Sequence, residues 1–200
     1  MAYADFTLER VEADFGLTTR LVELFPDLPD LPPSAWVVES LARGRRFAPL
    51  ISEKSRSEYL VAPILAAAQD FAPGNLAVYS GQRLDVDPSR SLVGECDFIL
   101  ALTPPVPRLK APLLMVMEAK RGDIDLGLGQ CAAQMVAARL FNERSGLARP
   151  IFGCLTTGED WQFMKLDRDH ILLDMKRLYI SNLGIILGVL DAIIAQGSRA

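Results

Sequence analysis

The chain has 200 residues, 50% hydrophobic and 23% charged, which is the balance of a folded globular protein with a sizeable core and excludes extensive disorder. Its net charge of −4 argues against a protein that binds nucleic acid through overall positive charge. One histidine (His170) and three cysteines without a CxxC pair argue against catalytic triads, histidine-based metal hydrolases, disulfide frameworks and structural zinc sites.

The first 50 residues carry short helical patterns interrupted by prolines. Helices are predicted over residues 7–15, 18–25 and 34–42, with the proline-rich stretch PDLPDLPP before the last of them. No linker, repeat or low-complexity segment divides the chain. We therefore expect one domain over residues 1–200, in which residues 1–50 form a helical elaboration packed on a core.

The core elements are expected over residues 52–167. A helix is predicted over residues 55–71, with Ser55 as its N-cap and an interruption at Pro63. Three strands follow at 76–84, 94–102 and 113–120, then a helix at 126–145 and two strands at 150–156 and 160–166. Helices at 168–179 and 182–196 complete residues 168–200. This order predicts an α/β fold, an α/β/α sandwich around a central mixed sheet.

Charged side chains stand at the end of the apolar segment LLMVMEAK. Glu118 and Lys120 are two residues apart on a predicted strand, so they share one face. A structural salt bridge on the sheet is one interpretation of this pair. The preceding strand carries Asp97, with Glu95 on the same face, and antiparallel pairing would put Asp97 beside Glu118. Carboxylates in close array repel each other, and a divalent cation such as Mg²⁺ or Mn²⁺ relieves that repulsion.

These residues resemble the PD-(D/E)XK nuclease superfamily, whose core is restriction-endonuclease-like. Asp97 matches the family's motif aspartate, Glu118-Ala119-Lys120 matches its (D/E)XK element, and Glu58 matches its helical glutamate. Gln130 and Gln134 are similar to the family's QxxxY element, with Gln in place of Tyr.

The resemblance implies hydrolysis of nucleic acid, DNA by default with RNA left open, giving a 5′-phosphate and a 3′-hydroxyl. It also implies that Asp97, Glu118 and Glu58 bind Mg²⁺ or Mn²⁺, and that Lys120 positions water and stabilises the transition state. The alternative is a binding or assembly module that keeps the fold without turnover.

Other interpretations exist for the individual residues. Ser55 and Glu58 also have the spacing of a capping box, which would keep Glu58 at the helix N-terminus. Gln130 and Gln134 are neighbours on one helical face and could simply be solvated. Cationic residues before Glu58 could contact phosphates or be ordinary surface charge. They are Arg43, Arg45, Arg46, Lys54 and Arg56.

The C-terminal segment NLGIILGVLDAII is strongly apolar and contains GxxxG at Gly184 and Gly188, but it is short for a membrane span and holds Asp191. It predicts a core helix or a homodimer surface over residues 182–196. No secretory signal is recognised in MAYADFTLER, so we expect a cytoplasmic protein.

Overall fold

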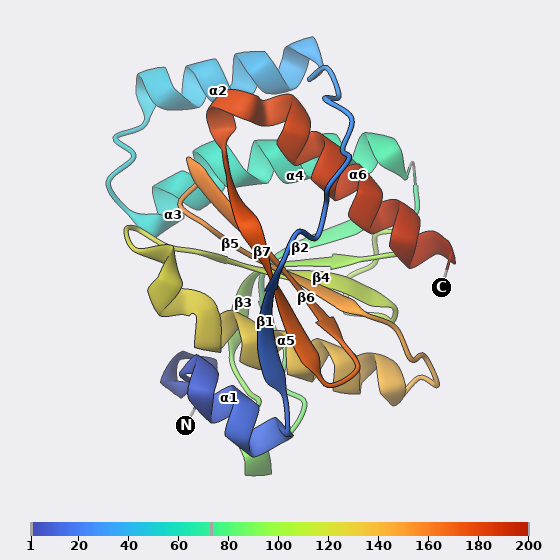
Figure 1. Ribbon diagram of the computed structural model, residues 1–200. Coiled ribbons are helices and arrows are strands. Elements are labelled where there is room, and N and C mark those ends of the chain that lie inside the picture. The colour runs from blue at the N-terminus through green and yellow to red at the C-terminus, as the bar shows by residue number, and fades with distance from the viewer. Residues whose placement is uncertain (1, 73, 200) are drawn as a thin grey trace.

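The computed structural model describes residues 2–72 and 74–199, and a seven-stranded sheet lies at its centre (Figure 1). The spatial order of the strands is β1-β7-β6-β5-β4-β3-β2. β1 is parallel to β7 and β4 is parallel to β5, whereas the other neighbouring pairs are antiparallel. The strands are β1 Thr18–Val22, β2 Ala77–Arg83, β3 Glu95–Ala101, β4 Leu113–Ala119, β5 Ile151–Thr156, β6 Asp160–Asp167 and β7 His170–Tyr179.

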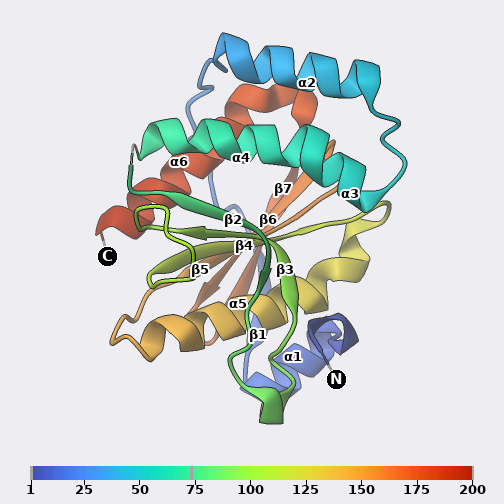
Figure 2. The same ribbon diagram turned by 180° about the vertical axis from the view of Figure 1, so that it is seen from behind.

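Helices cover both faces of this open mixed sheet. The helices are α1 Leu8–Phe15, α2 Ala35–Phe47, α3 Glu53–Arg56, α4 Ala62–Ala68, α5 Leu128–Glu143 and α6 Leu183–Arg199. α1 and α5 lie on one face, and α2, α3, α4 and α6 lie on the other (Figures 1 and 2). Each layer has its own apolar core against the sheet. The predicted α/β class with helices around a mixed sheet is therefore confirmed.

The strands and helix predicted between residues 76 and 166 form close to the expected positions. All seven residues of β4 are buried, as expected of a central strand covered by helices on both sides. Trp161 and Phe163 are fully buried, and Cys96, Cys131 and Cys154 are free and buried. Apolar runs of strand length between turn residues were sufficient to predict these elements.

The helix predicted over residues 18–25 is wrong, because Thr18–Val22 is the edge strand β1. Helix α1 ends at Gly16, which adopts a left-handed backbone with φ of 65°. The chain then pairs in parallel with β7, Thr18 opposite His170. The β-branched pair Thr18 and Thr19 favours a strand, and pairing with a segment about 150 residues later could not be deduced from local pattern. The N-terminal elaboration thus contributes a strand to the central sheet.

The helix predicted over residues 168–179 is also wrong, because His170–Tyr179 is strand β7. A two-residue turn joins β6 to β7, with Arg168 in the left-handed region at φ of 54° and Asp167 paired with His170. β7 is only partly buried and has no clean alternation of apolar and polar residues. Its apolar positions are therefore compatible with either a helix or a strand.

The start of the segment containing Glu58 also needs correction. Ser52, not Ser55, is the N-cap of α3: its Oγ accepts a hydrogen bond from the Ser55 N–H, while Ser55 Oγ accepts one from the Ser52 N–H. The expected interruption near Pro63 is present as a π-helical turn over Ser57–Val61, between α3 and α4. Because the N-cap lies three residues earlier than predicted, Glu53 is the first residue of the helix and Glu58 lies further along it.

The apolar C-terminal segment forms α6, which packs in the core against the α4 side of the sheet. By length and composition Ile180–Arg199 could cross a membrane, with mean hydropathy 1.6, but 61% of its apolar window is buried inside the protein. The GxxxG glycines face the proline-rich stretch of the same chain: a side chain at Gly184 or Gly188 would overlap Asp30 and Leu31 or Pro29. The motif thus has a partner within the chain, and a homodimer through α6 stays a prediction.

Candidate active site

The antiparallel ladder between β3 and β4 brings two carboxylates together. Phe98 is opposite Met117, so one step further Asp97 faces Glu118 across the pair. Asp97 Oδ2 accepts a hydrogen bond of 2.7 Å from the Ala119 N–H, which fixes its carboxylate beside the end of β4. The position is the carboxyl end of β4, where it runs parallel to β5, and ligand sites of open α/β sheets commonly lie at such strand ends.

Glu118 is surrounded by hydrogen-bond donors and is only 3% exposed. Its Oε2 accepts from Lys120 Nζ at 3.2 Å and from Gln130 Nε2 at 2.6 Å, and its Oε1 accepts from Gln134 Nε2. Lys120 Nζ also donates to Gln130 Oε1 at 2.9 Å. The sheet salt bridge that the sequence suggested is therefore present, but it forms part of a larger polar group.

Helix α5 supplies the two glutamines from successive turns of one face. Gln134 is fully buried, and Gln130 connects Lys120 to Glu118. The interpretation of these glutamines as simply solvated is thus wrong. Gln134 Oε1 is buried without a hydrogen-bond partner in the described chain. A buried amide oxygen that accepts no hydrogen bond lowers the stability of the fold. At Gln134 Oε1 the polar group therefore lacks a hydrogen-bond donor.

Burial and mutual repulsion alter the acidity of both carboxyl groups. The pKa of Glu118 is raised from 4.5 to about 7: loss of hydration is the largest cause and the charge of Asp97 adds to it, while the hydrogen bonds from Gln134 and Lys120 and the charge of Lys120 act in the opposite direction. Burial also raises the pKa of Asp97, against the lowering effect of the Ala119 N–H and Lys120. Two carboxyl groups that resist ionisation side by side are typical of a site that receives a cation.

The structure does not bring Glu58 to this group. Its side chain is more than half exposed, and its carboxylate pairs with Lys54 Nζ at 3.8 Å on the preceding turn. Glu53, the first residue of α3, reaches the segment after β4 instead: its Oε1 accepts from the Arg121 N–H at 3.2 Å, and its charge raises the pKa of Asp97. The sequence analysis placed the start of this helix at Ser55, which left Glu53 outside the helix, whereas the structure begins it after Ser52.

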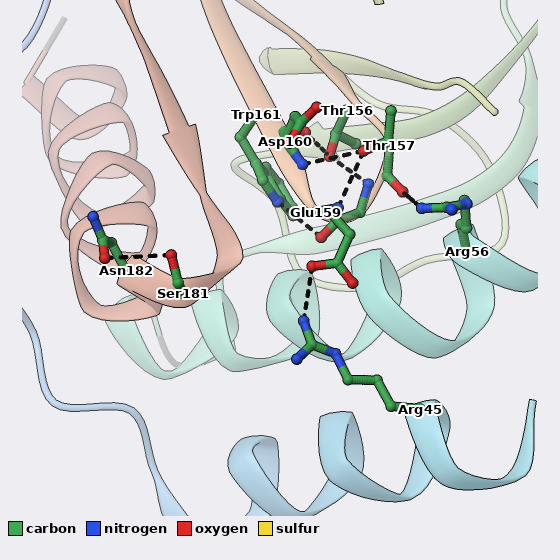
Figure 3. Close-up of polar contacts among 10 residues, drawn as sticks. Arg45, Arg56, Thr156, Thr157, Glu159, Asp160, Trp161, Ser181 and Asn182 are labelled. Carbon is green, nitrogen blue, oxygen red and sulfur yellow. Dashed lines mark hydrogen bonds and ion pairs between the residues drawn. The ribbon is translucent and has the colours of Figure 1, made fainter. Parts of the chain in front are cut away.

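A tight turn between β5 and β6 forms the adjacent rim of the site. The Lys120 N–H donates to Thr156 O at 2.7 Å, which joins the end of β4 to this turn. Thr156 Oγ1 donates to Asp160 O and accepts from the Gly158 N–H, so the turn is closed by its own side chain (Figure 3).

Two arginines connect this turn to helices α2 and α3. Arg45 Nη2 pairs with Glu159 Oε2 at 2.8 Å, and Arg56 Nη1 donates to Thr157 O at 3.1 Å (Figure 3). Arg56 Nε is buried without a hydrogen-bond partner in the described residues. α2 and α3 are therefore anchored to the same end of the sheet as Lys120.

The oxygen donors present fit a hard divalent cation as a partial ligand set. Asp97 Oδ1 makes no hydrogen bond within residues 2–72 and 74–199, and the repulsion between Asp97 and Glu118 would fall if a cation bound between them. Within the same residues, no group of three or more His, Cys, Asp or Glu side chains is arranged to hold a metal. A metal at this point would need oxygen ligands beyond the two carboxylates.

No known protein family matches this chain, and no curated protein matches its sequence.

Proposed function

We propose that this protein is a metal-dependent phosphodiesterase that hydrolyses nucleic acid, and that its fold is the restriction-endonuclease-like member of the α/β class. The observation that carries the proposal is the contact group of Asp97, Glu118, Lys120 and Gln130 at the end of a buried strand. Membership of the PD-(D/E)XK superfamily and a cytoplasmic location belong to the same proposal. DNA is the default substrate and RNA is the other candidate.

Asp97 and Glu118 would hold Mg²⁺ or Mn²⁺, with Glu53 in the position that the sequence had suggested for Glu58. When bound, the ion would lower the pKa of a water molecule and neutralise charge developing on the phosphate. Lys120 is kept in place by two oxygens, Glu118 Oε2 and Gln130 Oε1, so its remaining N–H is available to a water or a phosphate oxygen. Gln130 therefore acts as a positioning residue for Lys120.

A binding or assembly module with the same fold is the second candidate. One observation favours it: both oxygens of Glu118 already accept hydrogen bonds from Lys120, Gln130 and Gln134, which is the pattern of a satisfied structural group. Catalysis would require Glu118 to give up at least one of these bonds to a metal. The nuclease candidate therefore predicts measurable cleavage of nucleic acid, and the binding-module candidate predicts none.

Cleavage assays distinguish them. Purified protein is incubated with linear, circular, single-stranded and branched DNA and with RNA, in Mg²⁺ or Mn²⁺, beside Lys120→Met and the exposed-lysine control Lys110→Met. The proposal predicts cleavage by wild type and Lys110→Met and none by Lys120→Met, because only Lys120 contacts the site. Equal signals from wild type and Lys120→Met on every substrate would contradict nuclease function and favour the binding module.

A further inference from the structure

Exposed apolar side chains gather around the connection between α2 and α3. In the described chain, nine large apolar side chains are exposed, and five of them lie between Trp36 and Tyr59. Phe47 is 72% exposed and Ile51 is 70% exposed, whereas Tyr59 is 44% exposed. Solvent contact on this scale is costly for an aromatic ring, and large apolar patches at a protein surface are typical of interaction sites.

A glycine lets the backbone of Tyr59 pack closely on α2 near Phe47. Gly44 lies on α2, one helical turn before Phe47, and its backbone packs directly on the residue that carries the second ring. A Cβ at Gly44 would be 2.7 Å from Tyr59 O and 3.0 Å from Tyr59 Cβ. We call the exposed surface of Phe47, Ile51 and Tyr59 the α2–α3 platform.

Cationic groups interleave with the aromatic ones. Residues 39–58 hold five Arg or Lys and three Glu, a local charge of +2 in a chain of net charge −4. Arg43, Arg46 and Phe47 line a hollow of about 270 Å³, and the Arg46 guanidinium lies 5.5 Å from the centre of the Phe47 ring. Arg46 has no carboxylate partner in the described chain, whereas Arg43 pairs with Glu39 at the exposed surface.

The platform continues into the candidate active site. α3 begins with Glu53, which accepts the Arg121 N–H one residue after Lys120, and Arg56 reaches the turn between β5 and β6. In Figure 2, the C-terminal end of α2 leads down to α3 beside the segment that follows β4. An extended ligand lying on the platform would therefore lead toward Asp97 and Glu118.

We propose that the α2–α3 platform binds single-stranded nucleic acid. A base can stack on Phe47 or Tyr59 only when it is not already stacked and paired inside a duplex, and Arg46 supplies a cation for the neighbouring phosphate. Duplex recognition, in contrast, needs groups that enter a groove or follow two backbones. The inference deepens the proposed function by naming the form of its substrate, and rests on it only for cleavage.

Binding in EDTA tests the platform separately from turnover. Fluorescence anisotropy is measured with a labelled single-stranded 20-nucleotide DNA, an RNA of the same sequence and the corresponding DNA duplex. We expect a single strand, DNA or RNA, to bind more tightly than the duplex, and Phe47→Ala to weaken that binding by roughly 5- to 100-fold, the loss of one stacked base. Phe47→Trp should retain it, and Arg46→Gln should lower the salt dependence by about one unit of slope.

Met175→Ala is the matched control, because this side chain is 68% exposed on β7. Unchanged single-strand affinity in Phe47→Ala, or equal affinity for duplex and single strand, would overturn the inference. So would the absence of oligonucleotide binding by wild type in EDTA. None of these results depends on the metal or on Lys120, so they leave the cleavage test unaffected.

Discussion

At the scale of single residues, the titration of Glu118 connects the site to stability. Its pKa of about 7 lies above the ordinary 4.5, so between these values the folded protein binds more protons than the unfolded chain. The free energy of unfolding contributed by this group is therefore highest at low pH and falls as pH rises from about 4.5 to 7. The full decrease amounts to roughly 3 kcal/mol for an isolated group.

Glu118→Gln should remove this decrease, because an amide cannot ionise. In EDTA at pH 8, we expect the variant to be at least as resistant to urea as wild type. The free energy of unfolding of wild type should be higher at pH 5 than at pH 8, and this difference should be smaller in the variant. The control is Glu58→Gln, which changes an exposed carboxylate. A large loss of stability in Glu118→Gln at pH 8 would instead mean that the hydrogen bonds from Gln130 and Gln134 make Glu118 structural.

The residues of the site were predictable to different degrees. The shared face of Glu118 and Lys120 follows from the period of two on a strand, and Asp97 follows from the expected antiparallel pairing of the two apolar strands. Glu58 was expected in the group from the family resemblance, whereas in the structure its exposed carboxylate pairs with Lys54. Glu53 enters the site only through the packing of α3 on β4, which no local pattern indicates.

At the scale of elements, the strands at the ends of the chain could not be predicted. β3, β4 and β5 are apolar runs between turns, and their burial follows from their composition. β1 and β7 are partly exposed; β1 is an edge strand that pairs only with β7, while β7 pairs with both β1 and β6. Pairing between segments so distant in sequence is a tertiary effect that overrides local propensity.

The close packing of α6 on the proline-rich stretch gives a prediction at the same scale. A methyl group at Gly188 would overlap Pro29 O, a backbone atom that cannot rotate away. Gly188→Ala should therefore lower the melting temperature by a few degrees, since overpacking of about 1–3 kcal/mol exceeds the gain in helix propensity of about 1 kcal/mol.

Gly122→Ala is the control for this substitution, because a Cβ at Gly122 meets no atom within 4 Å. Thermal unfolding followed by circular dichroism should show little change for Gly122→Ala. A higher melting temperature for Gly188→Ala would mean that residues 28–31 do not pack on α6 as described.

At the scale of the whole molecule, the site lies where the two helical layers meet one end of the sheet. α5 supplies Gln130 and Gln134 from one face, while α3 supplies Glu53 from the other layer. Between them, β3 supplies Asp97 and β4 supplies Glu118, with Lys120 directly after the end of β4. Because its residues come from both helical layers and from the sheet, this group forms only in the complete fold.

The central claim is that this group binds a divalent cation for phosphodiester hydrolysis, and a crystal soaked in Mn²⁺ at pH 8 tests it most directly. Both carboxyl groups should be ionised at that pH when the cation is present, because its charge lowers their raised pKa values. The account predicts an anomalous difference peak between Asp97 and Glu118, within about 2.0–2.6 Å of a carboxylate oxygen of each. Crystals that show Mn²⁺ only at other carboxylates, with Glu118 still bonded to Lys120, Gln130 and Gln134, would contradict it.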